Sequence, residues 1–399
     1  MRIGILTLHD SVNYGAVLQA YALRSYLTEC GHEAVVIDRR RNPDLTLRAP
    51  PVRTCPFRLL GLFPCEAYDG MREAGVRVAR TEEFLSGKVG MTPFRFCDWR
   101  DAPADLGVDL LIVGSDQVWN ANNLDPADYL LRNVPGNVPG VAYAASIGMS
   151  AFPSDRVAEF RAGFARFRAI GVREGEAAEM VRALGFAAEH VVDPVLLAGR
   201  APWDNLQAEA RSEKGRVLAY FLAENLDSSA TSLARFAKSR SARVDLFVDW
   251  FTRKTPHGVS RWLKNRRHAT RLSRMGIDLH LDAGPVEFVR SIAASEVVVS
   301  NSYHALMFAL LFGKEIRIVL PTHPVRRKMN ARLREFEDLV TGAPLVLPDL
   351  AAALSSLESG ERLSVRTDEL SARITASRDW LSQVLNDIIR GNGRISGQD

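Results

Sequence analysis

The residues best suited to chemistry lie in one short run near the end of the chain, Ser300-Asn301-Ser302-Tyr303-His304. An apolar stretch typical of a strand precedes the run, and an apolar stretch typical of a helix follows it. Serine and asparagine favour the start of a helix, where free N–H groups and the helix dipole attract an anion. We therefore expect Ser300, Asn301 and Ser302 to bind a phosphate, with His304 beside it as a proton donor. The alternative is a structural role for His304, which is common for a lone histidine in a first helical turn.

A second polar run, Asn13-Tyr14-Gly15, separates the first predicted strand from its helix. Asn13 can cap this helix, and Gly15, which lacks a Cβ, lets a ligand approach the backbone. Both residues are therefore candidates for binding a substrate. A capped turn without a ligand is an alternative of equal weight. Because the run has a single glycine, the G-x-G-x-x-G pattern of dinucleotide-binding loops is absent.

Two charged residues also follow apolar strands. Asp116 comes after Asp109–Val113, and Arg173 comes directly after Ala169–Val172. A carboxylate in this position can remove a proton from a sugar hydroxyl, or it can cap the next helix. Arg173 can bind phosphate or carboxylate through two N–H groups, or it can form a surface ion pair with Glu174. Since open α/β sheets hold ligands at the carboxyl ends of their strands, we expect Asp116 and Arg173 to face one site.

Alternating strands and helices must position these groups. In the first half, the predicted strands are Ile3–Leu8, Ala34–Asp38, Asp109–Val113, Val141–Ile147, Ala169–Val172 and Val191–Asp193. In the second half, they are Val217–Leu222, Val244–Val248, Ile277–Leu281, Val297–Ser300 and Ile316–Leu320. The predicted helices include residues 15–29, 155–168, 176–184, 228–239, 285–293 and 303–312. This alternation indicates two mostly parallel, doubly wound sheets.

We therefore predict an α/β protein of GT-B-like architecture, with two Rossmann-like domains that face a cleft and a closing C-terminal helix. The first domain is predicted over 1–205, with a partly helical insertion at about 42–105 that we interpret as a lid or acceptor-binding region. The second is predicted over 214–350, after a polar linker. The C-terminal helix, over 365–391, is expected to pack back across the domains.

Composition excludes several classes of protein. The net charge of +4, from 51 basic and 47 acidic residues, is too small to indicate nucleic-acid binding. The scattered residues Cys30, Cys55, Cys65 and Cys97 indicate reduced thiols and no metal site. No basic-then-apolar leader is present, and no apolar run approaches the roughly 20 residues of a membrane span, so we expect a cytoplasmic protein. The basic run at 253–274 is typical of a solvated helix face; a nucleic-acid patch, contact with an anionic pyrophosphate and peripheral contact with the inner membrane surface are alternatives.

Six segments, taken in order, resemble the polysaccharide pyruvyl transferase family. They are IGILTLHDSVNYGAVLQAYAL at the start, DLLIVGSDQVWN at 109–120, YAASIG at 143–148, GVREGEAAEMVRALG at 171–185, VVDPVLL at 191–197 and GPVEFVRSIAASEVVVSNSYHALMFALLFGKEIRIVL at 284–320. Each segment is only moderately specific, but six in the same order are quite specific. The resemblance covers about residues 1–340, most of the chain.

The resemblance implies a GT-B-like fold and a transferase of cell-surface polysaccharide biosynthesis, including exopolysaccharide. Such an enzyme moves a pyruvyl group from phosphoenolpyruvate to sugar hydroxyls, commonly as a ketal that bridges two of them. The family's donor-binding arginine falls on Arg173 and its histidine on His304. Phosphoenolpyruvate is then a co-substrate, and we expect no cofactor and no metal. The acceptor could be a lipid-linked oligosaccharide, a nucleotide sugar or a finished polymer unit.

The chain departs from the family pattern at one position. Characterised branches have Arg-Leu-His at the helix start, where this chain has Ser302-Tyr303-His304. The missing arginine has three candidate replacements beyond the next strand, Arg326, Arg327 and Lys328. In the expected mechanism, His304 protonates the enol carbon of the donor and Asp116 deprotonates the sugar hydroxyl. The donor is held by Arg173, by the turn at Ser300–Ser302 and by the loop of Asn13 and Gly15.

Two other functions stay open on the sequence. A GT-B glycosyltransferase that uses a nucleotide sugar would fit the same architecture. A non-catalytic binding protein could also keep this fold. Convergence of Asn13, Asp116, Arg173 and His304 in space would argue against the non-catalytic protein.

Overall fold

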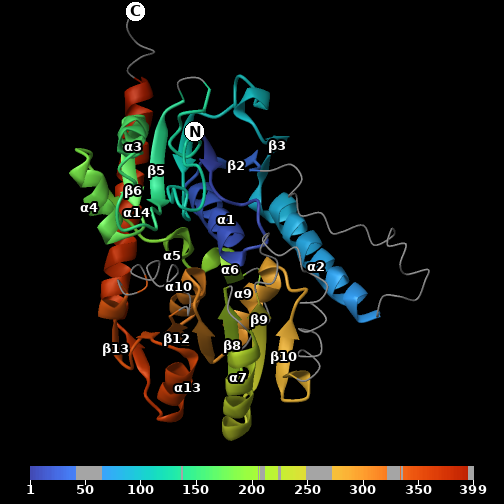
Figure 1. Cartoon of the computed structure of the whole chain (residues 1–399). Helices are drawn as coiled ribbons and strands as arrows, with labels where there is room; N and C mark the ends of the chain where they lie inside the picture. Colours follow the sequence, from blue (N-terminus) through green and yellow to red (C-terminus); the bar gives the residue numbers. More distant parts are fainter. Residues whose placement is uncertain are drawn as a thin grey trace, which may run out of the picture.

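The protein contains two large parallel sheets flanked by helices, one above the other in Figure 1, and a small antiparallel pair of strands, β13 (Val340–Gly342) and β15 (Leu363–Val365). This computed structural model describes residues 1–41, 65–135, 138–204, 206, 212–222, 226–248, 272–320, 333 and 336–393. The predicted α/β class, with two doubly wound sheets, is confirmed.

The first sheet has seven parallel strands in the order β3-β2-β1-β4-β5-β6-β7. The strands are β1 (Arg2–Leu6), β2 (Glu33–Arg39), β3 (Met91–Phe96), β4 (Leu110–Val113), β5 (Gly140–Ala145), β6 (Phe167–Val172) and β7 (Glu189–His190). Every residue of β4 and β5 is buried, because helices cover both faces of the sheet. These helices are α1 (Tyr14–Glu29), α2 (Cys65–Phe84), α3 (Val157–Phe164) and α4 (Gly175–Ala183), followed by the short α5 (Pro194–Ala198) and α6 (Ala201–Asp204).

The second sheet has six parallel strands in the order β10-β9-β8-β11-β12-β14. The strands are β8 (Arg216–Phe221), β9 (Arg243–Val248), β10 (Ile277–His280), β11 (Val297–Ser300), β12 (Glu315–Val319) and β14 (Val346–Leu347). The helices are α7 (Leu226–Arg240), α9 (Pro285–Ala294), α10 (Tyr303–Leu311) and α13 (Leu350–Glu358). In both sheets the strand that comes first in the chain is an interior strand. The order of strands along the sheet changes direction there, because later strands are added first on one side of it and then on the other. Ligands bind at such reversal points, here between β1 and β4 and between β8 and β11.

The segment predicted as an insertion is partly built into the first sheet. After the long helix α2 and a π-helical turn at Leu85–Val89, residues Met91–Phe96 pair with β2 as the edge strand β3. The sequence analysis missed this strand because Pro93 interrupts it, and proline is tolerated only where a strand has a free edge. Part of the predicted insertion, residues 42–64, lies outside the described residues.

The two domains share one continuous hydrophobic core. Helices α1 and α5 of the first domain pack against α9 and α10 of the second, and all but α1 lie between the two sheets in Figure 1. Tyr14, the first residue of α1, is buried and stacks on Phe288 of α9 with ring centroids 4.4 Å apart. Its hydroxyl donates to the carbonyl of Ala283, 2.8 Å away. This packing fixes the N-terminus of α1 against the second domain.

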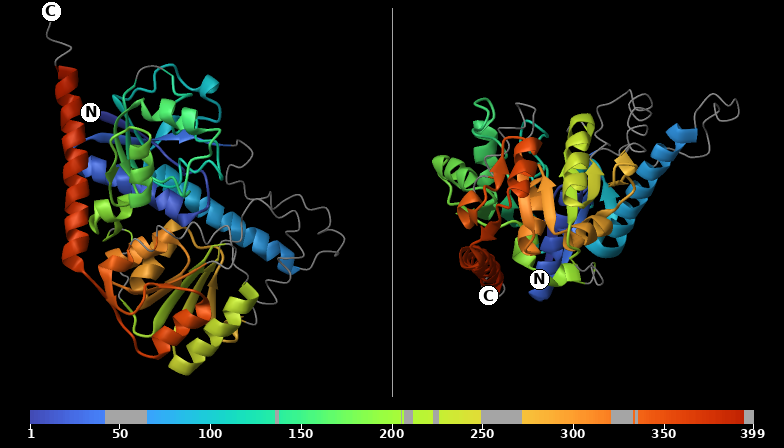
Figure 2. Two further views of the ribbon diagram at one scale, coloured as in Figure 1. Left: turned by 60° about the vertical axis from the view of Figure 1, so that its left-hand side comes forward. Right: turned by 90° about the horizontal axis from the view of Figure 1, so that it is seen from below.

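The C-terminal helix α14 (Thr367–Gly393) runs back along the first domain (Figure 2). Arg378 donates to the carbonyl of Leu197 at the end of α5, and the hydroxyl of Ser377 accepts from the N–H of Val192, 3.0 Å away. The Trp380 ring packs on Gly171 of β6, where a side chain would clash with it. The helix therefore holds the segment between β7 and α5 in place.

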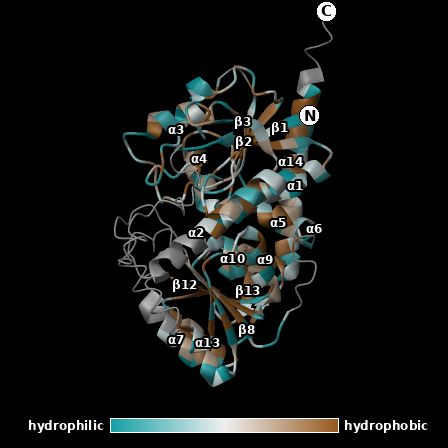
Figure 3. Ribbon diagram, turned by 90° about the vertical axis from the view of Figure 1, so that its right-hand side faces the viewer, coloured by the Kyte–Doolittle hydropathy of each residue, from teal (hydrophilic) through white to brown (hydrophobic). Residues whose placement is uncertain are grey.

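Apolar residues are concentrated inside the two domains rather than along any one helix. In Figure 3 the strands of the second sheet are coloured as hydrophobic, whereas the helices around them include hydrophilic stretches. In the part of the chain that the structure describes, no helix is both long enough and apolar enough to span a membrane.

Replacing Tyr14 with alanine should destabilise the protein strongly. The substitution leaves a cavity against Phe288, and loss of a buried aromatic ring costs about 3–5 kcal/mol. Urea unfolding followed by circular dichroism measures the change. Tyr14→Phe is the matched control, because it keeps the ring and loses only the hydrogen bond to Ala283, worth about 1 kcal/mol. Equal losses in the two variants would contradict the importance of the stacked ring.

Candidate active site

Four predicted site segments meet where the two domains touch. Ser115 and Asp116 follow β4, Arg173 follows β6, and His304 lies in the first turn of α10. The fourth segment is the N-terminus of α1, where a Cβ added to Gly15 would lie 2.1 Å from Nδ1 of His304. The structure thus brings Gly15 and His304, which are 289 positions apart in the sequence, into contact. The convergence expected from the sequence is present.

Arg173 is fully buried and surrounded by acidic groups. Its Nε lies 3.4 Å from Oε1 of Glu174, and its Nη1 lies 3.2 Å from Oδ2 of Asp193. Its guanidinium also covers the ring of Tyr303, with Cζ 4.3 Å from the centroid. Nη2 has no hydrogen-bond partner among the described residues and lies 3.9 Å from Oδ1 of Asp116. We expected Arg173 to bind a ligand through two N–H groups. In this conformation only Nη2 is left without a hydrogen bond to the described residues.

The ionisation of Arg173 follows from these surroundings. Burial alone lowers the pKa of its guanidinium, but Tyr303 and the carboxylates of Glu174 and Asp193 raise it above the ordinary value. Arg173 is therefore a permanent cation in the site. Both Arg173 and Glu174 are buried, so the alternative of a surface ion pair between them is wrong.

Asp193 is a central residue that the sequence analysis did not select. It is fully buried, and its Oδ1 accepts from the N–H of Val195 as the N-cap of α5. Its Oδ2 accepts from Arg173 and from the hydroxyl of Ser115, 3.3 Å away, and lies 3.6 Å from Nε2 of His304. The available signal was the Asp193-Pro194 pair at the end of the predicted strand Val191–Asp193, since an Asp-Pro pair is typical of a helix start.

The N-terminus of α1 contacts His304 directly. The Oδ1 atom of Asn13 accepts from the N–H groups of Gly15 and Ala16, at 2.9 and 3.3 Å, and so caps the helix. Because Gly15 has no side chain, the imidazole of His304 occupies the space beside its backbone. The space that we expected a ligand to use is therefore filled by His304 in this conformation.

The run before α10 joins two strands of the second sheet. The hydroxyl of Ser300 donates to the carbonyl of Tyr220 on β8, at 2.6 Å, and accepts from the N–H of Ser302. The side chain of Asn301 bonds both backbone groups of Leu222. Ser302 takes the N-cap position of α10, but its side chain makes no capping hydrogen bond. Of the three residues, Ser300 and Asn301 thus use side-chain atoms to hold β11 beside β8.

Asp116 and Glu174 add two further carboxylates. Asp116 has a positive φ of 67°, which aspartate tolerates, and its side chain is 20% exposed. Oε1 of Glu174 accepts from the hydroxyl of Ser146, whereas Oε2 is buried without a hydrogen-bond partner among the described residues. Within the described site, Arg173 and His304 thus face three carboxylates, those of Asp116, Glu174 and Asp193.

The site described above does not include the three candidate replacements for the family arginine. Arg326, Arg327 and Lys328 lie outside the described residues, as does most of the basic run at 253–274. Among the residues that the structure describes, no group of three or more His, Cys, Asp or Glu side chains is arranged to hold a metal ion. The expected independence of metals and cofactors stays a prediction.

Two features near the site have other roles. His9 pairs with Asp38, and Asp10 pairs with Arg41, in a buried ionic network beside β2. Burial raises the pKa of Asp10, but the charge and hydrogen bonds of Arg41 lower it below the usual value.

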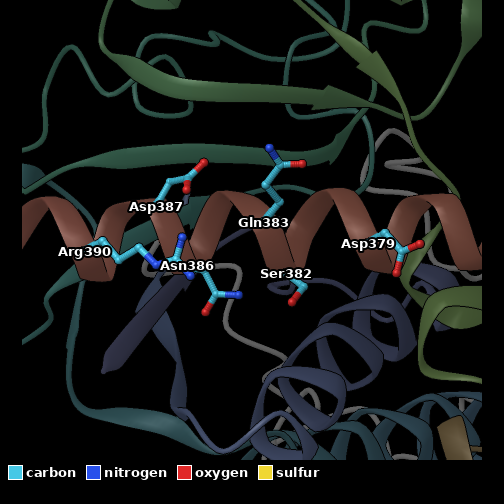
Figure 4. A pocket seen from close by; sticks show the side chains of 6 residues that line it. All are labelled: Asp379, Ser382, Gln383, Asn386, Asp387 and Arg390. Carbon is cyan, nitrogen blue, oxygen red and sulfur yellow. The ribbon is translucent and has the colours of Figure 1, made fainter.

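A separate surface pocket on α14 is lined by polar residues of that helix alone (Figure 4): Asp379, Ser382, Gln383, Asn386, Asp387 and Arg390.

Replacing Gly15 with alanine should displace His304 and destabilise the protein. The new Cβ would overlap the imidazole, and such overpacking costs about 1–3 kcal/mol. Thermal or urea unfolding measures the loss, and NMR of the histidine ring reports the displacement. Gly391→Ala, in α14, is the matched control: no atom lies within 4 Å of its added Cβ, so stability should hold or rise. An unchanged His304 signal in Gly15→Ala would refute the direct contact.

Comparison with known proteins supports the architecture. A search of curated protein sequences finds no match. Among solved structures, a UDP-N-acetylglucosamine 2-epimerase from Rickettsia bellii has a TM-score of 0.54 and 11% identity, over 98% of this chain and 97% of that one. A UDP-GlcNAc 2-epimerase from Neisseria meningitidis, bound to UDP-GlcNAc, has a TM-score of 0.51 and 11% identity, over 97% and 100%. These likenesses concern the fold alone, and they confirm the GT-B-like architecture.

The family is identified by sequence. The model of the polysaccharide pyruvyl transferase family matches residues 13–320. This range runs from the cap of α1 to the end of β12, and it includes Arg173, Asp193 and His304. Because the match spans most of the 399 residues, the chain belongs to the polysaccharide pyruvyl transferase family.

Proposed function

We propose that this protein transfers a pyruvyl group from phosphoenolpyruvate to sugar hydroxyls, with ketal formation, in the synthesis of a cell-surface polysaccharide. One observation carries the proposal beyond family membership. Arg173 of the first domain and His304 of the second approach the same oxygen of Asp193, at 3.2 and 3.6 Å. A permanent cation and a group that can donate a proton are what an enol phosphate with a carboxylate requires.

The donor is held by the cation and by backbone N–H groups. Nη2 of Arg173 is the guanidinium nitrogen that the surrounding carboxylates leave available. The N-terminus of α10, where the Ser302 side chain makes no capping hydrogen bond, is proposed to offer backbone N–H groups to the phosphate. Arg173 is completely buried in this conformation, so the donor reaches it only when Tyr303 or the second domain moves aside. Arg326, Arg327 and Lys328 are proposed to supply the charge of the family arginine.

The reaction begins with proton transfer to carbon. His304 donates its proton to the methylene carbon of phosphoenolpyruvate, which becomes a methyl group, and positive charge develops at the neighbouring carbon. A sugar hydroxyl adds there, and its proton passes to Asp116. The phosphate leaves with the proton from Asp116, a second hydroxyl adds to the same carbon, and its proton returns to His304. The products are the ketal and inorganic phosphate, and both residues recover their starting states.

Incubation with phosphoenolpyruvate and a panel of acceptors tests the proposal. The panel includes lipid-linked oligosaccharides, nucleotide sugars and polymer fragments, and mass spectrometry detects a ketal-linked pyruvyl adduct together with phosphate release. His304→Ala should fold normally and lose about 100-fold or more of the rate, the usual contribution of a general acid. Near-normal turnover in that variant would contradict the role of His304 as the proton donor.

The same panel separates the other functions. Glycosyl transfer from a nucleotide sugar, with no pyruvyl adduct, would show a glycosyltransferase. Binding of a sugar without turnover of any donor would show a non-catalytic protein. A preference for lipid-linked acceptors would place the enzyme at the surface of a membrane.

Arg173→Lys should weaken donor binding by roughly 10-fold or more, since a hydrogen bond to a charged group is worth about 1.5–3 kcal/mol. A lysine keeps the charge but cannot contact Glu174, Asp193 and a ligand together. Isothermal titration calorimetry with phosphoenolpyruvate measures the change. Arg132→Lys is the matched control, because Arg132 is an exposed residue paired with Glu159. Equal affinities in wild type and Arg173→Lys would contradict a donor contact.

A further inference from the structure

We propose that Asp193 is a positioning residue that holds the proton donor His304 and the cation Arg173 in one unit across the domain boundary. The inference deepens the proposed function and rests on it. Asp193 lies in the first domain, between β7 and α5, whereas His304 lies on α10 of the second domain. Neither the family match nor the structural likenesses assign a role to Asp193.

The surroundings of Asp193 allow a single orientation of its carboxylate. Oδ1 is fixed by the N–H of Val195, 3.0 Å away, so Oδ2 must point toward the site. There it meets the hydroxyl of Ser115, Nη1 of Arg173 and Nε2 of His304, at 3.3, 3.2 and 3.6 Å. Asp193 is fully buried and His304 is nearly so, and in such surroundings an ion pair is stronger than at the surface. The carboxylate can therefore orient both the cation and the imidazole.

The distance to His304 has a functional meaning. At 3.6 Å the Oδ2 atom of Asp193 is too far from Nε2 for a hydrogen bond, and the contact becomes an ion pair when the ring is protonated. Contacts of catalytic groups are often long before the substrate binds and shorten in the complex. A carboxylate beside an imidazole favours the protonated ring, which is the form that a proton donor needs. Asp193 would thus keep His304 both oriented and protonated.

Other groups around His304 limit the alternatives. Tyr303 of the same helix meets its ring edge-on, and the capped N-terminus of α1, with Asn13 and Gly15, packs on the Nδ1 side. Arg173 approaches from the end of β6 but shares the carboxylate of Asp193. The N–H groups at the start of α1 and the charge of Arg173 both oppose a positive imidazole. Among the residues that the structure describes, Asp193 lies beside the ring and carries a negative charge that offsets them.

Asp193→Asn tests this role with little change of shape. Asparagine caps a helix as well as aspartate does, so α5 should persist, while the negative charge is lost. The NMR titration midpoint of His304, identified by its absence in His304→Gln, should move down by about one pH unit or more. Since a general acid must be protonated, the pH at which pyruvyl transfer declines on the alkaline side should fall too. The rate near neutral pH should drop by about 10-fold or more.

Asp245→Asn is the matched control. Asp245 is also fully buried between an arginine and a histidine, with its two oxygens 2.6 Å from Nε of Arg216 and 2.7 Å from Nε2 of His280. It lies within β9 of the second sheet, outside the site described above. The control should lower the stability of the protein and leave both the His304 titration and the pH profile of transfer unchanged.

The outcomes separate this inference from the proposed function. An unchanged His304 midpoint in Asp193→Asn, or an unchanged pH profile in an active enzyme, would overturn the role of Asp193. If the wild type transfers no pyruvyl group, the proposed function fails, and the titration still decides whether Asp193 controls the protonation of His304. Should Asp193→Asn fail to fold, Asp193→Ser, which also keeps a cap, replaces it in the same titration.

Discussion

A single buried carboxylate at the domain junction is the constraint on which the arrangement of this site depends. Removing a carboxylate from water costs several kcal/mol unless partners compensate for it. Asp193 finds its partners at the end of β4, the end of β6, the start of α5 and the start of α10. These four chain segments must therefore keep a fixed relation to one another. The requirement links the first sheet to the second through charge as well as through packing.

Apolar packing brings the partners to this point. Tyr14 stacks on Phe288 and fixes the start of α1, so Gly15 and the cap at Asn13 meet His304. Protein interiors are close-packed, so even one added carbon at Gly15 would move the imidazole. A continuous core across the two domains thus gives His304 its position. The C-terminal helix supports the arrangement from the other side, where it holds the segment before α5.

The charge of the site has a consequence for a donor that is itself an anion. The described site directs three carboxylates toward one arginine, and Arg173 uses two of its nitrogens on them. These contacts hold the guanidinium rigid, with one nitrogen and the ring of Tyr303 at its open side. In this chain, Ser302 stands where characterised branches of the family have an arginine. Under the proposed function, binding of this anion is therefore assigned to helix N–H groups and to the basic residues that follow β12 in the sequence.

The two-domain α/β fold could be predicted from sequence because strand and helix periodicity is local. The apolar residues of β1, β4 and β11 are buried, and the residues after each strand had to lie at the carboxyl edge of its sheet. For the same reason Asp116, Arg173 and His304 could be selected as candidates. Edge strand β3 was missed because its residues show little alternation and include Pro93.

The sequence by itself determined the fold, the family and the strand ends that carry polar groups, since each of these follows from residues close together in the chain. Only the tertiary structure decided which groups touch. It showed Ser300 and Asn301 bonding backbone, Glu174 buried, and Asp193 between Arg173 and His304. The contact between Asp193 and His304, which lie in different domains, depends on how two separately patterned domains pack. That packing is a property of the whole core, which no local pattern specifies.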